Sequence, residues 1–235
     1  RVEPLLKSTW DQLTSNNYPN GPPCYNYYTP NNWYCGCVAT MMAQIMRYHE
    51  WPTKSVESKT KTCYVEGVAT DLTMKGGRYD WALMSLNPKF SGTTEANREA
   101  IGKLCYDCGV VNNMQYNSVG SGAYSSLVKD SLVEDFGYRY ARFIYYYDGY
   151  PFKYDEFRTI IITNCDAQKP VGLGIGVSGA QSGHAVVADG YGYEGETPFV
   201  HLNFGWGGYK DFWYNLPDMT EAGDKYTVVD GVNYN

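Results

Sequence analysis

The stretch "NNWYCGCVATMMAQIMRYHEWP" carries two cysteines, one glycine apart, directly before a run with helical periodicity. Cys37 is the second of them, and the helix is predicted to begin at about Val38. A thiol at that place meets unpaired backbone N–H groups and the positive end of the helix dipole, which favour the thiolate. Cys37 is therefore a candidate nucleophile for covalent catalysis. The alternative is a structural cysteine, and a base within its reach decides between the two.

The chain has three histidines that could serve as that base. His49 lies twelve residues along the same helix, about 18 Å from Cys37 at the rise of an α-helix, which excludes it. His184, in "SGHAVVADG", opens a predicted strand next to Gly183, which leaves backbone room for a substrate. His201 lies within an apolar strand. Because a catalytic imidazole needs an open approach, we favour His184 over His201.

A third group would orient the imidazole, and two residues are candidates. Asn203 and Asp189 both carry side-chain oxygens, and each could instead make an ordinary turn or strand-end hydrogen bond. Asn203 is followed by Phe204 and Trp206, whose rings could exclude water from a buried contact. We therefore favour Asn203.

Acyl transfer through a tetrahedral intermediate also requires hydrogen-bond donors for the developing oxyanion. The backbone N–H of Cys37, at the start of the helix, is one candidate. Gln12, in "STWDQLTSNNYP", is a second, because the loop that leads to Cys37 could bring its amide alongside. The alternative for Gln12 is an ordinary surface residue.

Two other patterns are rejected as sites. "GLGIGVSG" (172–179) has dinucleotide-type glycine spacing, but a strand-like segment follows where a helix is required. Cys35, Cys37, Cys105 and Cys108 could be imagined as a zinc site, but Cys-x-Cys is poor spacing for zinc. Cys105 and Cys108 also fall on the apolar face of their predicted helix, where cysteine serves as a small hydrophobe.

The first part of the chain is predicted to be mainly helical. Residues 1–36 are rich in Pro, Asn and Tyr and are expected to be extended loop, with one short helical turn near 5–10. Apolar spacing predicts helices over 38–49, over 95–116 with an end at Gly109, and over 122–138. For the last of these, Ser125 or Ser126 is the expected N-cap and Gly137 the stop.

From about residue 139 the pattern of apolar residues changes. Short apolar or alternating runs bounded by Gly and Pro predict antiparallel strands. A chain that is helical first and stranded second has an α+β fold rather than an alternating βαβ arrangement.

Composition limits the partners. The formal net charge of -6, without clustered Lys and Arg, argues against nucleic acid and against acidic membranes. No run of eighteen apolar residues is present, so we expect no membrane span, and the initial Arg1 suggests a processed product. Seven cysteines leave at least one thiol unpaired in a monomer.

Three segments together resemble the streptopain family of bacterial cysteine peptidases, which includes interpain-like enzymes: "GCVATMMAQIMRYHEWP", "SGHAVVADGYG" and "HLNFGWGGYKDFWYNL". Further similar segments extend the resemblance over nearly the whole chain in the same order. It implies one papain-like α+β catalytic domain over 1–235. A helical half at about 1–138 would carry the cysteine and a twisted antiparallel half at about 139–235 the histidine, with a cleft between them.

The resemblance also implies roles for the matching residues: Cys37 as nucleophile, His184 as general base, Gln12 as oxyanion donor, and Asn203 and Trp206 beside the histidine. Phe204 departs from the family, which usually has tryptophan there, so any indole N–H contact at that position is lost. Substrate is expected near Gly183, Trp206 and Ser121 of the "SGAYSS" segment.

The implied activity is hydrolysis of internal peptide bonds through a thioester, with no metal or organic cofactor. Such enzymes are secreted bacterial zymogens whose N-terminal prodomain acts as an inhibitor and is then removed. Two alternatives stay open: a non-catalytic, aromatic-rich module that binds carbohydrate through exposed Tyr and Trp, and a transferase that passes the same thioester to an amine.

Overall fold

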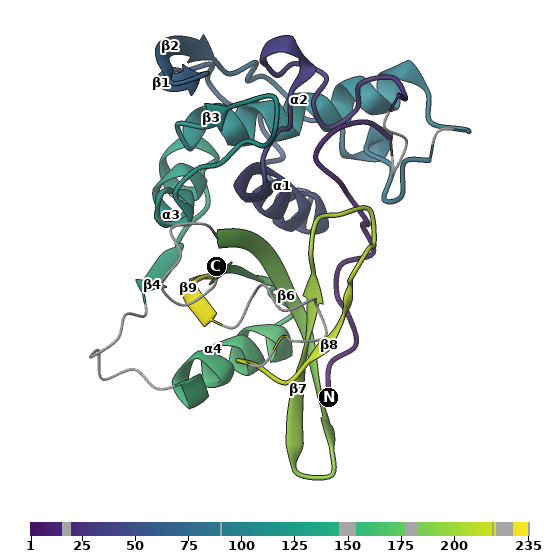
Figure 1. The fold of residues 1–235 in the computed structure, drawn as a ribbon, viewed down its shortest axis with the longest axis vertical. Helices are drawn as coiled ribbons and strands as arrows, with labels where there is room; N and C mark the ends of the chain where they lie inside the picture. Colours follow the sequence, from purple (N-terminus) through teal and green to yellow (C-terminus); the bar gives the residue numbers. More distant parts are fainter. Residues whose placement is uncertain are drawn as a thin grey trace.

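The structure is a computed structural model that describes residues 1–15, 20–89, 91–145, 154–176, 183–217, 219 and 228–234. The last residues of the glycine-rich stretch, 177–179, lie outside this part. The helical elements belong mainly to the first half and most of the strands to the second (Figure 1). The predicted α+β class is therefore confirmed.

Three helical segments were expected in the first half, and all three are present. Helix α1 spans Cys37–His49 and α2 spans Glu95–Val111, two residues past the predicted stop. The third segment runs through η3 (Ser125–Leu127), α3 (Val128–Asp130) and η4 (Ser131–Asp135). Its N-cap is Tyr124 and makes no side-chain bond, so the predicted serine cap is wrong.

A small sheet in the first half was not predicted. Strands β1 (Thr60–Val65) and β2 (Val68–Thr73) form an antiparallel hairpin, and β3 (Gln115–Tyr116) pairs parallel to β1. Two 3-10 turns, η1 (Pro30–Asn32) and η2 (Trp81–Leu83), complete this half.

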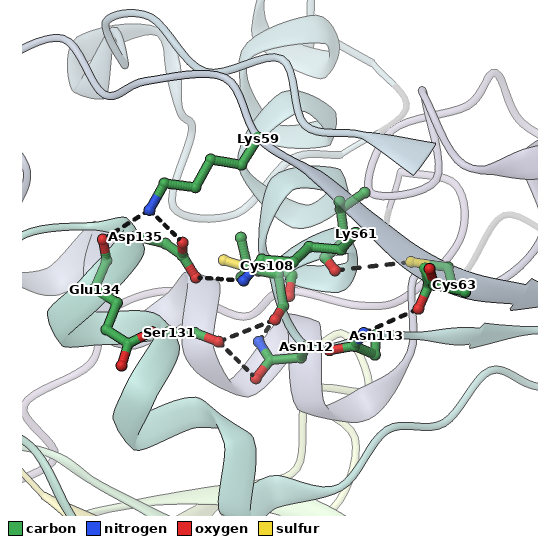
Figure 2. A network of polar contacts seen from close by, with 12 residues as sticks. Lys59, Lys61, Cys63, Cys108, Asn112, Asn113, Ser131, Glu134 and Asp135 are labelled. Carbon is green, nitrogen blue, oxygen red and sulfur yellow. Dashed lines mark hydrogen bonds and ion pairs between the residues drawn. The ribbon is translucent and has the colours of Figure 1, made fainter. Parts of the chain in front are cut away.

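Polar contacts tie this sheet to the helices (Figure 2). Lys59, next to β1, forms an ion pair with the buried carboxylate of Asp135 at 2.7 Å and donates to the carbonyl of Glu134 at 2.9 Å. Asn112, at the end of α2, donates to the carbonyl of Cys108 at 2.7 Å and accepts a bond from Ser131 at 3.3 Å. These contacts fix the third helical segment against α2 and β1.

The second half is built on a six-stranded sheet with the order β4-β9-β5-β6-β7-β8, in which all the paired strands are antiparallel. Its strands are β4 (Arg142–Tyr145), β5 (Val171–Gly176), β6 (Gly183–Glu194), β7 (Thr197–Asn203), β8 (Phe212–Tyr214) and β9 (Val228–Tyr234).

Helix α4 (Tyr154–Asp166) lies in this half, where the sequence was expected to form strands. It buries Phe157, Ile161 and Cys165, which are spaced four residues apart and so share one face. This helix was not predicted from the sequence.

Strand β6 joins two hydrophobic clusters. Ala185 and Val187 pack into the cluster of the helical half, whereas Val186 and Ala188 pack into the cluster of the sheet half. Because side chains alternate along a strand, one strand serves both cores. Helix α1 packs directly on β6, which brings the predicted nucleophile and base elements together.

The N-terminal segment is extended where a helical turn near 5–10 was expected. Val2 forms a bridge with Tyr191, and the N–H of Leu5 donates to the carbonyl of Asp189 at 2.9 Å. Pairing with β6 satisfies backbone groups that a helix would otherwise bond internally. No helix in the described part of the chain is both long enough and apolar enough to cross a membrane.

Candidate active site

The start of α1 requires a glycine. Gly36 is the N-cap, with φ at +93°. A Cβ at this position would lie 2.8 Å from the Met114 sulfur and 2.9 Å from the carbonyl oxygen of Ser121. Only glycine accepts both the left-handed backbone and this close approach. The turn that presents Cys37 is therefore packed directly against the Ser121 segment, one of the predicted substrate-binding positions.

The Cys37 thiol lies where α1 meets β6. Burial raises the pKa of this thiol, and the backbone N–H groups of Ala185, Val38 and Cys37 itself lower it. Burial is the larger effect, so the start of the helix favours the thiolate but does not by itself outweigh burial, and a base is still required. The contribution of Ala185 also shows that the sulfur lies beside the residue that follows His184.

Hydrogen bonds hold Gln12 next to the cysteine loop. The N–H of Cys35 donates to the carbonyl of Gln12 at 2.9 Å. The hydroxyl of Thr40, in the first turn of α1, donates to the carbonyl of Asp11 at 3.2 Å. The segment that carries Gln12 is thus bonded to the chain on both sides of Cys37.

His184 is buried and is held on two sides. Its Nε2 lies 2.7 Å from the carbonyl oxygen of Phe204. The ring of Trp206 stacks on the imidazole with centroids 4.5 Å apart and planes 25° apart, and the ring of Phe204 stacks at 5.9 Å. These contacts hold the plane of the imidazole ring. Gly183, beside it, is exposed at the start of β6.

Asn203 does not hold the imidazole directly. Its Nδ2 donates to the carbonyl of Ser8 at 2.9 Å, and its Oδ1 accepts bonds from Gln44 at 2.9 Å and from the N–H of Gly205 at 3.0 Å. The contact at Nε2 of His184 comes from the backbone one residue further along. The expectation that the Asn203 side chain orients the imidazole is therefore corrected.

The other two histidines have different surroundings. His201 Nδ1 lies 2.7 Å from Asp189, whose second oxygen accepts the N–H of Leu6 at 2.8 Å. Asp189, the second candidate for orienting the base, therefore serves His201. His49 lies at the far end of α1, where burial and then the charge of Lys169 lower its pKa.

Asp211 supports the turn that contacts His184. Its Oδ1 accepts the N–H of Phe204 at 2.7 Å. Burial raises the pKa of Asp211 to about 6, whereas the Phe204 N–H and His201 oppose the rise. A carboxyl whose pKa is higher in the folded chain holds an extra proton there between about pH 4 and pH 6.

This difference predicts a measurable pH effect of Asp211→Asn. Folded wild-type protein binds more protons than unfolded protein across that interval, so its free energy of unfolding falls as pH rises from 4 to 6. Asp107, whose pKa burial also raises to about 6, remains in both proteins. Urea unfolding from pH 4 to pH 8 should show wild type losing stability relative to Asp211→Asn up to about pH 6 and no further. A difference that is constant with pH would contradict the assignment.

A model of the peptidase C10 family matches residues 19–214, most of the chain. The chain belongs to the peptidase C10 family. Within this family, streptopain of Streptococcus pyogenes is 29% identical over 244 residues, which cover 94% of this chain and 58% of streptopain. The thiol protease/hemagglutinin PrtT of Porphyromonas gingivalis is 33% identical over 198 residues, 81% of this chain and 22% of PrtT.

The C10 fold is also shown by solved structures. Active wild-type interpain A, a cysteine protease of Prevotella intermedia, matches with a TM-score of 0.81 and 28% identity, over 100% of this chain and 94% of that one. A prointerpain A fragment matches with a TM-score of 0.75 and 29% identity, over 71% of its length. The resemblance to streptopain and its papain-like α+β fold are confirmed. The chain spans 58% of the length of the streptopain sequences it matches.

One polar residue of this C10 site was missed in the sequence. Gln44 is buried on α1, and its side chain reaches Asn203. Cys37, Thr40 and Gln44 are spaced three and four residues apart, so they share one helical face. A glutamine among the buried methionines of this helix was the signal that could have found it.

Proposed function

We propose that this chain is a cysteine endopeptidase that hydrolyses internal peptide bonds, with Cys37 as nucleophile and His184 as general base. The observation that carries the proposal is the position of the Cys37 sulfur at the backbone N–H of Ala185, the residue that follows His184, whose imidazole is held by the Phe204 carbonyl and the Trp206 ring. Membership of the C10 family favours this function over a carbohydrate-binding module.

Catalysis begins with transfer of the thiol proton from Cys37 to His184. Because Nε2 faces the Phe204 carbonyl, Nδ1 is the nitrogen that takes this proton. The resulting thiolate and imidazolium neutralise each other, and the N–H groups of Ala185 and Val38 support the sulfur charge. This transfer overcomes the burial that otherwise keeps the thiol protonated.

The thiolate then attacks the scissile carbonyl carbon, forming a C–S bond while the carbonyl electron pair moves to oxygen. The backbone N–H of Cys37 and the amide of Gln12 donate to this oxyanion. His184 returns its proton to the leaving amine as the C–N bond breaks, which leaves a thioester. Water, deprotonated by His184, attacks the thioester; the C–S bond breaks and the sulfur regains its proton. None of these steps needs a metal or an organic cofactor.

The substrate would lie extended beside the site. Gly183 is exposed at the start of β6 and offers backbone groups, and the Ser121 segment packs on Gly36 just before the nucleophile. Trp206 would border the substrate on the histidine side. In this proposal residues 1–235 form one papain-like catalytic domain whose helical and sheet halves meet at α1 and β6.

We also propose that the enzyme is secreted by a bacterium and is made with an N-terminal prodomain that inhibits it. Its support is the match to a prointerpain A fragment and to streptopain sequences longer than this chain. The protein substrates of the mature enzyme would then meet a site from which the prodomain has been removed.

Digestion of an unfolded protein, with the cleavage sites mapped by mass spectrometry, tests the proposed function. We expect internal cleavage that an epoxide thiol reagent stops. Release of only terminal residues would contradict an endopeptidase. Incorporation of an added amine in place of water would support the transferase alternative, since a thioester accepts either nucleophile.

A further inference from the structure

A buried chain of hydrogen bonds connects the cysteine helix to the turn that holds His184. It starts at Gln44, which lies two turns along α1 from Cys37. Gln44 is only 1% exposed. Gln44 Oε1 accepts the Ser8 hydroxyl at 2.8 Å and the N–H of Trp10 at 3.3 Å. Both acceptor positions of this oxygen are therefore occupied, which fixes the direction of the Nε2 donor.

Nε2 of Gln44 donates to Oδ1 of Asn203 at 2.9 Å. The same oxygen accepts the N–H of Gly205 at 3.0 Å. That N–H belongs to the peptide group whose carbonyl is Phe204 O, and this carbonyl lies 2.7 Å from Nε2 of His184. Asn203 thus acts on the imidazole through one peptide group, and Gln44 acts through Asn203.

The turn is also pressed against α1. Gly205 has φ at +64°, and a Cβ there would lie 3.0 Å from the Thr40 methyl group and 3.9 Å from Gln44 Nε2. The peptide group that contacts His184 therefore packs on the same face of the helix that carries Cys37. Movement of this turn would change the distance between the two proposed catalytic groups.

We propose that Gln44 is a positioning residue for the general base. Through Asn203 and the Phe204–Gly205 peptide group, it fixes the position of His184 relative to the helix that carries Cys37. The inference rests on the proposed function and deepens it. Buried polar networks of this kind are cooperative, so loss of one member loosens the others.

Gln44→Met keeps the size of the side chain and removes the amide. We expect kcat to fall by about 10- to 100-fold, because a misplaced catalytic group is costly, with KM within about two-fold of wild type. The Phe204 carbonyl stabilises the proton on Nε2, so the basic limb of the pH–rate profile should move to lower pH. The His184 resonance in proton NMR should likewise titrate at lower pH.

Asn112→Leu is the matched control. Asn112 is a fully buried amide of the same half, bonded to Cys108 and Ser131 (Figure 2) and to the sulfur of Met42 on α1. None of these hydrogen bonds reaches the His184 turn. Asn112→Leu should lower the free energy of unfolding, but its kcat and its His184 titration should stay the same as in wild type. Equal behaviour of Gln44→Met and Asn112→Leu would overturn the proposal, because Gln44 would then be structural only.

A double-mutant cycle tests whether Gln44 acts on His184 through Asn203 or only by making the whole site less rigid. If Gln44 acts through Asn203, Gln44→Met should cost little more in kcat once Asn203→Ala is present. Additive losses would overturn this route. If Gln44→Met does not fold, Ser8→Ala, which removes one donor to Gln44, should move the His184 titration the same way by less; an unchanged titration would overturn the proposal. A wild-type protein without hydrolysis would count against the proposed function, whereas the NMR titration still decides the positioning role.

Discussion

We expect Cys37→Ala to abolish peptide hydrolysis, with a loss in kcat/KM of about 10⁴-fold or more. The reason is that Cys35, the other thiol beside the start of α1, is fully buried and so cannot form the thioester in its place. Cys37 keeps part of its surface exposed and alanine removes only the sulfur atom, so the free energy of unfolding should change by less than about 1 kcal/mol. Steady-state assay with a fluorogenic peptide and urea unfolding measure the two effects.

Cys165→Ala is the control for this change. Cys165 is a fully buried thiol of α4 in the sheet cluster, far in sequence from the site. Its removal should lower stability through lost packing and keep the activity. Turnover by purified Cys37→Ala above about 1% of wild type, well outside the predicted loss, would contradict the assignment of the nucleophile.

His184→Ala should reduce kcat/KM by about 10³-fold or more, because the base that takes the thiol proton is gone. His201→Ala should act on stability instead. It leaves the fully buried Asp189 carboxylate without its 2.7 Å partner, at an expected cost of about 1–3 kcal/mol in the free energy of unfolding.

The two histidine variants are best compared by kcat/KM and urea unfolding in parallel. Activity of His201→Ala within about ten-fold of wild type, with reduced stability, fits the proposed roles. The reverse pattern, in which His201→Ala is inactive and His184→Ala is active, would show that the wrong histidine has been assigned.

The parts of the fold that could be predicted are those with a local signal. Helix α1 follows from apolar periodicity and the proline after it, and the strands from 171 onward follow from short apolar runs between glycines. The β1–β2 hairpin was missed because its turn is Glu66–Gly67. Both residues have positive φ. An Asn-Gly pair is the usual sequence signal for such a turn, and Glu-Gly is a much weaker one.

The candidate site likewise has parts that the sequence predicts and parts that depend on the tertiary structure. Cys37 and His184 could be selected by residue type and setting. The group at Nε2 of His184 could not, because it is the backbone carbonyl of Phe204, and every residue has one. The state of the Cys37 thiol also depends on tertiary packing: the helix start favours a thiolate, but burial against β6 opposes it more strongly.

Proton exchange between Cys37 and His184 is the central claim, and alkylation of Cys37 across pH tests it most directly. Wild-type protein and His184→Ala would react with iodoacetamide from pH 4 to pH 9, with labelling of the Cys37 peptide followed by mass spectrometry. Since burial raises the pKa of this thiol, rapid labelling at mildly acidic pH requires the imidazole to hold the proton. We predict such labelling in wild type and labelling only at alkaline pH in His184→Ala. The same pH dependence in both proteins would contradict the account.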